Sequence, residues 1–262
     1  MSIFRRKRKS AHGWFGNYNN WDELTSISSG YEAAGILEKT RDALIQVKEG
    51  KAVYERDSVV FNEKIYPHAV VSAMLYAAAE CDNYLSVLDF GGSLGSTYFQ
   101  VREIIPPKIA LHWSVVEQEH YVREGQKYLE DEQLKFHFTI EESIAEAKPN
   151  VLLLSSVVQY LAKPHAFLQD LRKYDFKYII IDRTSFISGG QPDRMTLQVV
   201  PPDIYEARYP CWFLNEKRFL DHFVDYHKVM SFDSFVPGEK DFEIDHQKAG
   251  YSKGFFLVKS ND

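Results

Sequence analysis

Apolar and polar positions follow two different patterns along this chain of 262 residues. From Leu85 onward, short apolar runs alternate with amphipathic segments, which is typical of a parallel sheet with helices on both faces. The apolar runs predict five strands, at 85–90, 113–117, 135–139, 151–155 and 178–182. The amphipathic segments predict four helices, at 96–104, 120–131, 141–147 and 164–173. Two later apolar runs predict a closing antiparallel pair, at 226–233 and 254–259.

The N-terminal part shows helical periodicity instead. Apolar residues recur at helical spacing over 36–47, with Gly50 as a stop, and a second helical stretch at 66–80 is rich in Ala and Met. We expect these two helices to cap the glycine-rich turn that follows them. The sequence therefore predicts a basic tail and helical cap over 1–83 and the main domain over 84–262.

The first thirty residues combine a basic run with several aromatic rings. The run at 5–9 has two interpretations: weak contact with an anionic membrane surface or nucleic acid, or a solvated tail, which is the commoner state of such runs. Disordered tails rarely carry rings such as Trp14, Phe15, Tyr18 and Trp21. We therefore expect the segment after the basic run to pack onto the body of the protein.

The regular pattern lapses over 185–213, which is rich in Gly and Pro. Loops of this length are uncommon in compact domains and are often functional. The segment follows the strand at 178–182 and carries Tyr205, Tyr209 and Trp212, and such rings stack on the apolar faces of sugars. We predict an irregular lid that contacts the acceptor substrate.

Composition narrows the class of protein. Apolar content of 45% and charged content of 26% are ordinary for a globular protein, and a net charge of −6 argues against general nucleic-acid binding. Cys81 and Cys211 are too few and too far apart for a disulfide framework or a zinc site. No apolar stretch is long enough to span a bilayer, and the N-terminus lacks the apolar core of a signal peptide. We therefore expect a cytoplasmic protein.

The most informative motif is the turn after the strand at 85–90, which reads Asp89-Phe90-Gly91-Gly92-Ser93-Leu94-Gly95. Glycines suit a turn with unusual φ/ψ angles and a ligand that approaches the backbone closely. A dinucleotide-binding turn offers bare N–H groups to a pyrophosphate, and the carboxylate of Asp89 would repel that anion. The carboxylate instead suits a ligand with an ammonium and a sulfonium, and S-adenosylmethionine (SAM) carries both.

A second acid supports this interpretation. Glu117 ends the strand at 113–117 and lies 22 residues beyond Gly95. This offset is close to the value of about 20 at which an acid after the second strand accepts hydrogen bonds from ribose hydroxyls. Together the two acids predict a nucleoside pocket that binds SAM.

With these motifs in place, the chain resembles the class I SAM-dependent methyltransferases. More narrowly, it resembles a family of methyltransferases from bacterial lipopolysaccharide, O-antigen and capsule gene clusters. The matching segments are distributed over most of the chain, at 30–31, 54–58, 87–95, 115–118, 154–161, 182–184, 198–201 and 209–213. The resemblance implies an α/β Rossmann-like fold with a mostly parallel, seven-stranded sheet. One departure is Ser93, which stands at the middle glycine of the general turn motif.

The resemblance also implies the residues that hold the cofactor. Asp89 and the glycines would hold the methionine end of SAM, Glu117 the ribose and Gln118 the adenine. The end of the fourth strand faces both cofactor and substrate in this class. The implied set is Asp89, Gly91, Gly92, Gly95, Glu117, Gln118, Ser155 and Ser156. Glu141 has two interpretations, a contact to the adenine amine or a first-turn acid favoured by the helix dipole.

Candidate catalytic residues follow the fourth and fifth strands. Asp182 is a candidate general base and Arg183 a candidate clamp for a phosphate or carboxylate. An ion pair between these two residues that orders the local loop explains them equally well. Tyr160 lies on the edge that faces the substrate. His120 and His165 lie nearest that edge among the histidines, and both fit polar residues at helix starts better than bases. No group of residues has the spacing of a metal site.

These features support one functional interpretation and leave two alternatives. The chain reads as a SAM-dependent methyltransferase (EC 2.1.1 class) that O-methylates a sugar or sugar-linked small molecule in surface polysaccharide biosynthesis. The segment after the fourth strand lacks the Asn/Asp-Pro-Pro-Tyr motif of amino-methylating enzymes, which favours an oxygen acceptor. The first alternative is a catalytically silent protein of the same fold that binds a nucleotide or nucleotide-sugar. The second, a nicotinamide-dependent oxidoreductase, is disfavoured by Asp89.

Overall fold

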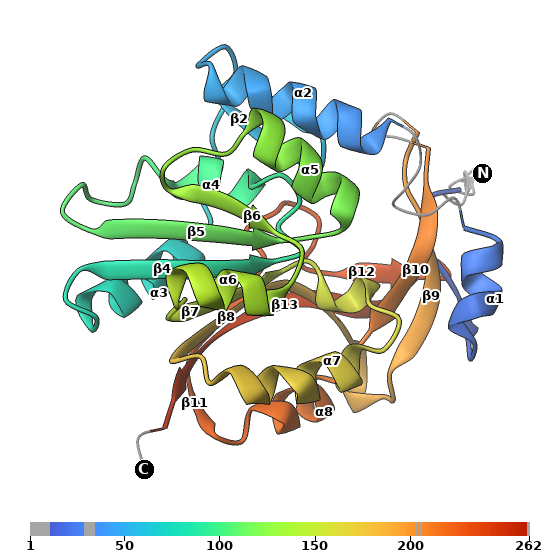
Figure 1. Cartoon of the computed structure of the whole chain (residues 1–262). Helices are drawn as coiled ribbons and strands as arrows, with labels where there is room; N and C mark the ends of the chain where they lie inside the picture. Colours follow the sequence, from blue (N-terminus) through green and yellow to red (C-terminus); the bar gives the residue numbers. More distant parts are fainter. Residues whose placement is uncertain (1–10, 29–34, 203, 205, 261–262) are drawn as a thin grey trace, which may run out of the picture.

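One mixed sheet of eleven strands organises the molecule (Figure 1), and residues 54–61 form a separate two-stranded hairpin. The computed structural model describes residues 11–28, 35–202, 204 and 206–260. Within these residues the main strand order is β10-β9-β1-β12-β13-β8-β7-β4-β5-β6, with β11 also paired to β13. No helix among the described residues is long and apolar enough to cross a membrane.

The parallel half of the sheet contains the five predicted strands, in the sheet order β8-β7-β4-β5-β6. Its strands are β4 (Tyr84–Phe90), β5 (Ala110–Val116), β6 (Leu134–His137), β7 (Val151–Ser155) and β8 (Tyr178–Ile187). All four neighbouring pairs run parallel. The run Val151–Leu154 is fully buried because helices cover both faces of the sheet, as expected for parallel strands.

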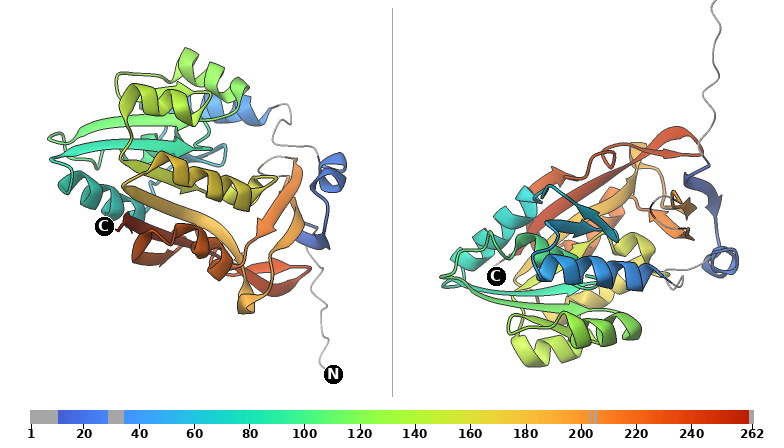
Figure 2. Two further views of the ribbon diagram at one scale, coloured as in Figure 1. Left: turned by 60° about the horizontal axis from the view of Figure 1, so that its bottom comes forward. Right: turned by 90° about the horizontal axis from the view of Figure 1, so that it is seen from above.

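Helices cover the two faces as the periodicity predicted (Figure 2). One core cluster packs α3, α4 and α5 against the sheet, and the second packs α7 and α8 against the opposite face. The helices on these faces are α3 (His68–Ala79), α4 (Ser96–Val101), α5 (Glu119–Tyr128), α6 (Ile140–Ala147), α7 (Pro164–Asp170) and α8 (Glu216–Leu220). Short 3-10 helices lie at Val158–Tyr160, Leu171–Tyr174, Ser188–Gly190 and Asp221–Phe223.

The antiparallel half contains more strands than we predicted. The closing pair forms as expected, because β11 (Tyr226–Asp233) runs antiparallel to β13 (Gln247–Lys259). The expected total of seven strands is nevertheless wrong. The long β13 pairs with β8 from Gly250 onward and with β11 through its second half, and its first residues form a hairpin with β12 (Phe242–Ile244). Three more strands then extend the sheet: β1 (Gly13–Tyr18), β9 (Arg194–Val199) and β10 (Arg208–Phe213).

The segment 185–213 is therefore not the irregular lid that we expected. β8 continues to Ile187, and β9 and β10 form an antiparallel hairpin. Its Gly and Pro residues serve other purposes: Gly189, at φ +69°, makes the turn after β8, and Pro210 lies within β10. β9 does alternate polar and apolar residues over Arg194–Val199, but the glycines and prolines around these strands outweighed that signal in the sequence.

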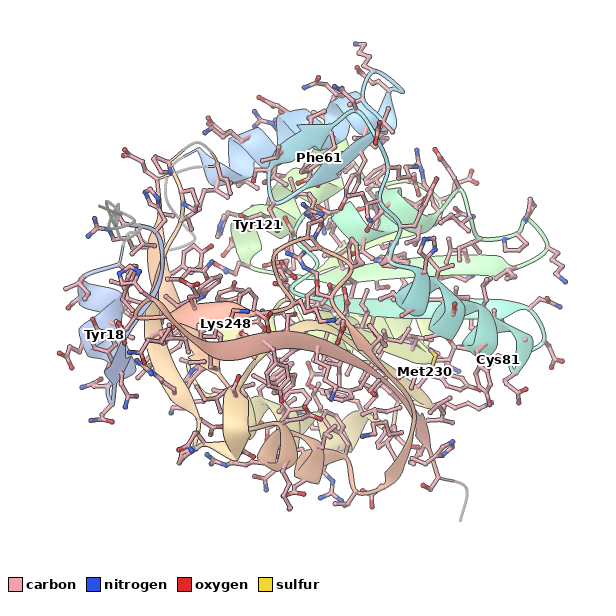
Figure 3. The ribbon with its side chains drawn as sticks, turned by 180° about the vertical axis from the view of Figure 1, so that it is seen from behind. Tyr18, Phe61, Cys81, Tyr121, Met230 and Lys248 are labelled. Atoms are coloured by element: carbon pink, nitrogen blue, oxygen red, sulfur yellow. The ribbon has the colours of Figure 1, made fainter. Side chains whose placement is uncertain are left out.

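The chain directly after the last of the added strands, β10, is hydrogen-bonded back to the end of β8. Phe186 of β8 bridges to Leu214, directly after β10. The N–H of Ile187 donates to the carbonyl of Leu214 at 2.9 Å, and the N–H of Leu214 donates to the carbonyl of Ser185 at 3.0 Å. A separate small core fills the enclosed end, with Trp14, Ile187, Phe213, Phe242 and Ile244. In the view from behind, Tyr18 and Lys248 lie at this end and Met230 near the other (Figure 3).

The N-terminal segment divides between this extension and the cap. β1 pairs with β9 and β12, which confirms that the aromatic segment packs onto the body. The cap contains α2 (Ile36–Lys48) and the hairpin of β2 (Tyr54–Arg56) and β3 (Val59–Phe61), which contact α4 and α5. α3 packs against β4 and β8 instead, so it covers the sheet and not the turn. The remaining helix, α1 (Trp21–Ser26), contacts β10, and the basic run 5–9 lies outside the described residues.

Candidate functional site

A pocket of about 750 Å³ opens at the carboxyl ends of β4, β5, β7 and β8. This volume lies within the range of roughly 300–1,000 Å³ that is typical of small-molecule sites. The edge at which the four strands end is also where open α/β sheets bind ligands. Nearly all the predicted site residues line it: Asp89, Gly91, Gly92, Glu117, Gln118, Ser155, Ser156, Tyr160, Asp182 and Arg183.

The turn after β4 is built around the buried carboxyl group of Asp89. The indole N–H of Trp113 donates to its Oδ2 at 3.2 Å. A Cβ atom on Gly92 would lie 2.5 Å from the same carboxyl group, so only glycine fits at this position. Burial raises the pKa of Asp89 to about 7, against the Trp113 hydrogen bond, which lowers it.

Two further residues, Ser93 and Gly95, shape this turn in different ways. Ser93 lines the pocket at φ +54°, a left-handed conformation in which a side chain is strained and glycine is favoured. Gly95, at φ +86°, does not belong to the pocket lining; a Cβ there would lie 3.2 Å from Leu134. Gly95 therefore sets the turn into α4 and is not placed against a ligand.

The second acid, Glu117, follows β5 beside this turn. The backbone N–H of Gln118 donates to its carboxylate at 2.7 Å, and the N–H of Ser93 also lowers its pKa by hydrogen bonding. Burial is the larger effect and raises the pKa of Glu117 to about 7. The negative charge of Glu117 also raises the pKa of Asp89. Two carboxyls in one pocket, both shifted toward neutral pH, favour a ligand that brings hydrogen-bond donors or positive charge.

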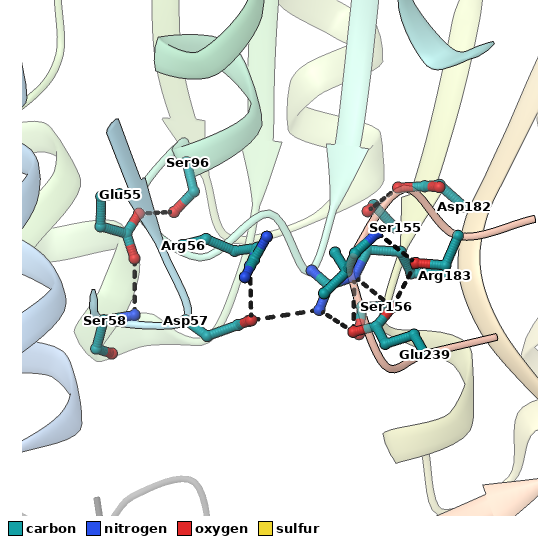
Figure 4. Close-up of polar contacts among 12 residues, drawn as sticks. Glu55, Arg56, Asp57, Ser58, Ser96, Ser155, Ser156, Asp182, Arg183 and Glu239 are labelled. Atoms are coloured by element: carbon teal, nitrogen blue, oxygen red, sulfur yellow. Dashed lines mark hydrogen bonds and ion pairs between the residues drawn. The ribbon is translucent and has the colours of Figure 1, made fainter. Parts of the chain in front are cut away.

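The cap supplies a third buried carboxyl group, which the sequence analysis missed. Glu55 of β2 accepts the hydroxyl of Ser96 at 2.6 Å and the backbone N–H of Ser58 at 2.7 Å (Figure 4). Burial raises the pKa of Glu55 to about 7. The Glu55–Ser96 hydrogen bond ties the cap to the first residue of α4, directly after the glycine turn. Its only sequence signal was the match at 54–58.

Asp182 and Arg183, at the bend of β8, do not pair with each other. The hydroxyl of Ser155 donates to Asp182 Oδ2 at 2.9 Å, and Oδ1 has no hydrogen-bond partner among the described residues. Burial raises the pKa of Asp182 to about 6. The guanidinium of Arg183 instead forms ion pairs with Glu239 at 2.6 Å and Asp57 at 3.3 Å (Figure 4). Asp182 thus offers one oxygen to a ligand, whereas Arg183 is held by two carboxylates.

The same edge carries an unusual backbone. Ser156 and Arg183 have φ values of +53° and +50°, and the N–H of Ser156 donates to the carbonyl of Asp182 at 2.9 Å. The Gln159 amide donates to Ser156 Oγ at 3.2 Å and to the carbonyl of Arg183 at 3.0 Å. Left-handed conformations of residues other than glycine cluster at functional sites, where surrounding contacts hold them in place.

Aromatic rings form the side of the pocket that the strand extension supplies. Four aromatic side chains and one proline line it: Trp21, Tyr160, Tyr209, Phe235 and Pro210. Tyr160 and Tyr209 meet edge to face, with ring centroids 5.4 Å apart. The hydroxyl of Tyr160 donates to the side-chain carbonyl of Gln198, on β9, at 3.1 Å.

One ring of the expected lid, Trp212, does not line this wall. Its indole N–H donates to the carbonyl of Leu161 at 3.1 Å. Its ring stacks on Trp21, which does line the pocket. Tyr205 lies outside the described residues.

Other candidates lie away from the pocket. Glu141 is on the surface, where the hydroxyl of Tyr174 donates to it and Lys173 lies 3.4 Å away, so a contact to an adenine is wrong. His165 hydrogen-bonds to His222 and to Asp193. His120 is not part of the lining either. Within the described part of the chain, no group of side chains has the arrangement of a metal site.

Comparison with known proteins identifies the fold. No family model matches this chain, and no curated protein does. Human N-acetylserotonin methyltransferase in complex with SAM is 10% identical, with a TM-score of 0.50 over 93% of this chain and 63% of that chain. The 1,6-didemethyltoxoflavin-N1-methyltransferase of Burkholderia thailandensis, with bound S-adenosylhomocysteine, is 12% identical, with a TM-score of 0.45 over 94% and 93%.

The likeness to the human enzyme shows the fold alone, since the identity is low. This chain has the Rossmann-like α/β fold of class I methyltransferases, with a mixed sheet of eleven strands. The predicted fold class is therefore confirmed, apart from the number of strands. The narrower resemblance to the lipopolysaccharide and capsule cluster family stays a prediction.

Proposed function

We propose that this protein is a SAM-dependent methyltransferase of the EC 2.1.1 class. The observation that carries the proposal is the pair of carboxyls, Asp89 and Glu117, at the ends of the adjacent parallel strands β4 and β5, on one pocket beside a glycine turn. The methyltransferase-like fold supports it. A pyrophosphate would meet both negative charges, so a dinucleotide fits this pocket less well.

Each residue has a defined part in the proposed reaction. Asp89 holds the ammonium of the methionine portion, and Glu117 and Gln118 hold the ribose and adenine. SAM, when bound, supplies a methyl group on a sulfonium for in-line transfer, and the protein mainly orients the two reactants. Asp182 Oδ1, which has no hydrogen-bond partner among the described residues, accepts the proton of an acceptor hydroxyl, while Ser155 fixes the other oxygen.

We further propose that the acceptor is a sugar or sugar-linked small molecule of surface polysaccharide biosynthesis, methylated on oxygen. The rings of Trp21, Tyr160 and Tyr209 support this, because sugar faces stack on such rings. The acceptor side of the pocket is then the strand extension formed by β1, β9, β10 and β12. It contacts the acceptor, as we expected of a lid. The free thiols of Cys81 and Cys211 support a reducing compartment, the cytoplasm.

Calorimetric titration tests the cofactor. The protein should bind S-adenosylhomocysteine (SAH) and not NAD. Asp89→Ala and Glu117→Ala should each weaken SAH binding by about 1.5–3 kcal/mol, roughly ten- to hundredfold, since a charge-assisted hydrogen bond is lost. Glu141→Ala, a surface acid outside the pocket, is the control and should bind like the wild type. Unchanged SAH affinity in both pocket variants would sink the assignment.

Ser93 favours the alternative of a catalytically silent binding protein, because it holds a strained conformation where the class motif has glycine. Transfer of a labelled methyl group from SAM to a panel of sugars, nucleotide-sugars and phenols separates the two. Turnover of any acceptor supports the enzyme. Tight SAH binding together with tight binding of a nucleotide-sugar, and no turnover, supports the silent protein.

A further inference from the structure

Arg56, on the cap strand β2, lines the same pocket from the opposite side to Asp182. Its side chain is only 16% exposed, and its guanidinium lies over the ring of Phe61 at 4.9 Å from the centroid. Its Nε and Nη1 atoms are buried, and neither has a hydrogen-bond partner among the described residues. A buried cationic donor without an acceptor costs free energy, so such groups normally meet an anion.

The carboxylates around Arg56 do not supply that acceptor. Asp57 Oδ2 lies 3.5 Å from Arg56 Nε and is half-exposed, and the same oxygen also contacts Arg183 at 3.3 Å. Glu239 contacts Arg183. Glu55 directs its two oxygens to a backbone N–H and a hydroxyl. One carboxylate is thus shared by two guanidiniums (Figure 4), which leaves Arg56 the less neutralised of the two.

We propose that Arg56 is the anion-binding group of this pocket and that its ligand is a carboxylate or a phosphate. A guanidinium is planar, always charged and rich in donors, which suits both anions. Phe61 fixes the plane of the guanidinium. The anion has two sources: the carboxylate of the methionine portion of the cofactor, or an acidic group on the acceptor. The inference deepens the proposed function by giving the pocket a positive contact beside its acids.

The first arm of the test addresses the cofactor. SAH, and an analogue of SAH that lacks the carboxylate, are titrated calorimetrically into the wild type, Arg56→Gln and Arg56→Lys. If Arg56 holds the methionine carboxylate, Arg56→Gln loses ten- to hundredfold in SAH affinity. The analogue then binds wild type and Arg56→Gln equally. Arg56→Lys, which keeps the charge, recovers part of the loss.

The second arm addresses the acceptor. Inorganic phosphate is titrated into the protein, both without SAH and with saturating SAH, and followed by thermal unfolding. If the anion belongs to the acceptor, SAH affinity is unchanged in Arg56→Gln, and phosphate raises the melting temperature of the wild type but not of that variant. Arg102→Gln is the matched control, because Arg102 also stacks on a ring, Phe99 at 4.7 Å, but lies outside the pocket lining. It should respond like the wild type in both arms.

The outcomes separate this inference from the proposed function. Failure of the wild type to bind SAH sinks the cofactor assignment, while phosphate stabilisation that depends on Arg56 still supports the anion site. The anion site is overturned if the analogue binds the wild type as tightly as SAH and phosphate does not distinguish the wild type from Arg56→Gln. In the cofactor arm, the comparison of SAH with its analogue on the wild type needs no variant, so a folding defect in Arg56→Gln does not obscure whether the carboxylate is recognised. In the acceptor arm, Arg56→Lys serves as the second variant.

Discussion

The two sides of the pocket are built from different kinds of structure. On the cofactor side, Asp89 and Glu117 lie at the ends of two strands, β4 and β5, that pair with each other in the sheet. On the acceptor side, Tyr209 and Pro210 lie on strands held together by long-range pairings. For example, the N–H of Gly16 donates to Asp245, 229 residues away.

The two sides therefore depend on the rest of the chain in different ways. The cofactor side needs one turn motif and a set of βα units that each bury their own strand. The acceptor side needs β1, β9, β10 and β12 to meet and close at Leu214. We therefore expect substitutions in the extension to affect stability or acceptor binding, and substitutions at the glycine turn to affect cofactor binding.

The largest effect should come from the small core of the extension. Phe213 is fully buried, and its ring lies 5.9 Å from Trp14 and 5.7 Å from Phe242. Phe213→Ala should lower the free energy of unfolding by about 3–5 kcal/mol, as truncation of a buried aromatic ring does. Urea unfolding measures this. A loss below about 1 kcal/mol would show that the closed end contributes little to stability.

The second prediction separates the two sides directly. In Gly92→Ala the new Cβ would lie 2.5 Å from the Asp89 carboxyl group, which must move. Overpacking at this position should lower the free energy of unfolding by about 1–3 kcal/mol, and SAH binding should weaken because the carboxyl group of Asp89 is displaced. Tyr209→Ala, on the acceptor side, should leave SAH affinity unchanged. Equal losses in both variants would mean that the two sides act as one.

The sequence predicted the parallel half well, for physical reasons visible in single elements. β7 is a continuous apolar run, which a buried parallel strand requires, and its predicted range 151–155 is the observed one. Asp89, Glu117, Ser155 and Asp182 were found because residues at the carboxyl ends of parallel strands share one edge.

The elements that the prediction missed depend on distant partners. Glu55 lies in a strand of three residues, too short for any periodicity, and its role depends on Ser96, 41 residues away. The extension was missed because glycines and prolines surround its strands. β9 does alternate polar and apolar residues over Arg194–Val199, but the nearby Pro192, Pro201 and Pro210 outweighed that signal. The stability of the extension comes from β1, which a pattern read along the chain does not connect to residue 194.

The third prediction concerns pH. In the ligand-free protein the pKa values of Asp89 and Glu117 are about 7, so both carboxyls are partly protonated below neutral pH. A bound ammonium and ribose hydroxyls favour the charged carboxylates, so binding releases protons. SAH affinity should therefore fall as pH drops below about 7, by up to tenfold (about 1.4 kcal/mol) per unit for each group. Calorimetry in buffers of different ionisation enthalpy measures the released protons.

Asp89→Asn is the control for this titration, since its amide does not ionise in this range. The variant should bind more weakly than wild type near pH 8, with a shallower pH dependence. A wild-type affinity that stays flat between about pH 5.5 and 8 would contradict the coupling of these carboxyls to the ligand.

The smallest effect is expected at Ser93, on the cofactor side. Ser93→Gly removes the strain of a side chain at φ +54°, about 1–2 kcal/mol, and adds backbone freedom to the unfolded state, about 0.5–1 kcal/mol. The net result should be a gain in stability of roughly 0.5 kcal/mol, seen in chemical unfolding, with SAH affinity retained. A clear loss of stability would show that the hydroxyl of Ser93 has a contact of its own.

The position of β1 inside the extension has a consequence for biosynthesis. Arg194 Nε donates to the carbonyl of Gly16, 178 residues earlier, and at about 5–20 residues per second the ribosome needs roughly 9–36 s to make that stretch. During this interval the backbone N–H and C=O groups of β1 and its aromatic side chains cannot pack against β9 and β12, which have not yet been synthesised. The βα units of the cofactor side are synthesised earlier. A nascent chain can therefore form the cofactor side of the pocket before the strands of the acceptor side are complete. Chaperone demand and premature aggregation should therefore be set by residues 13–18.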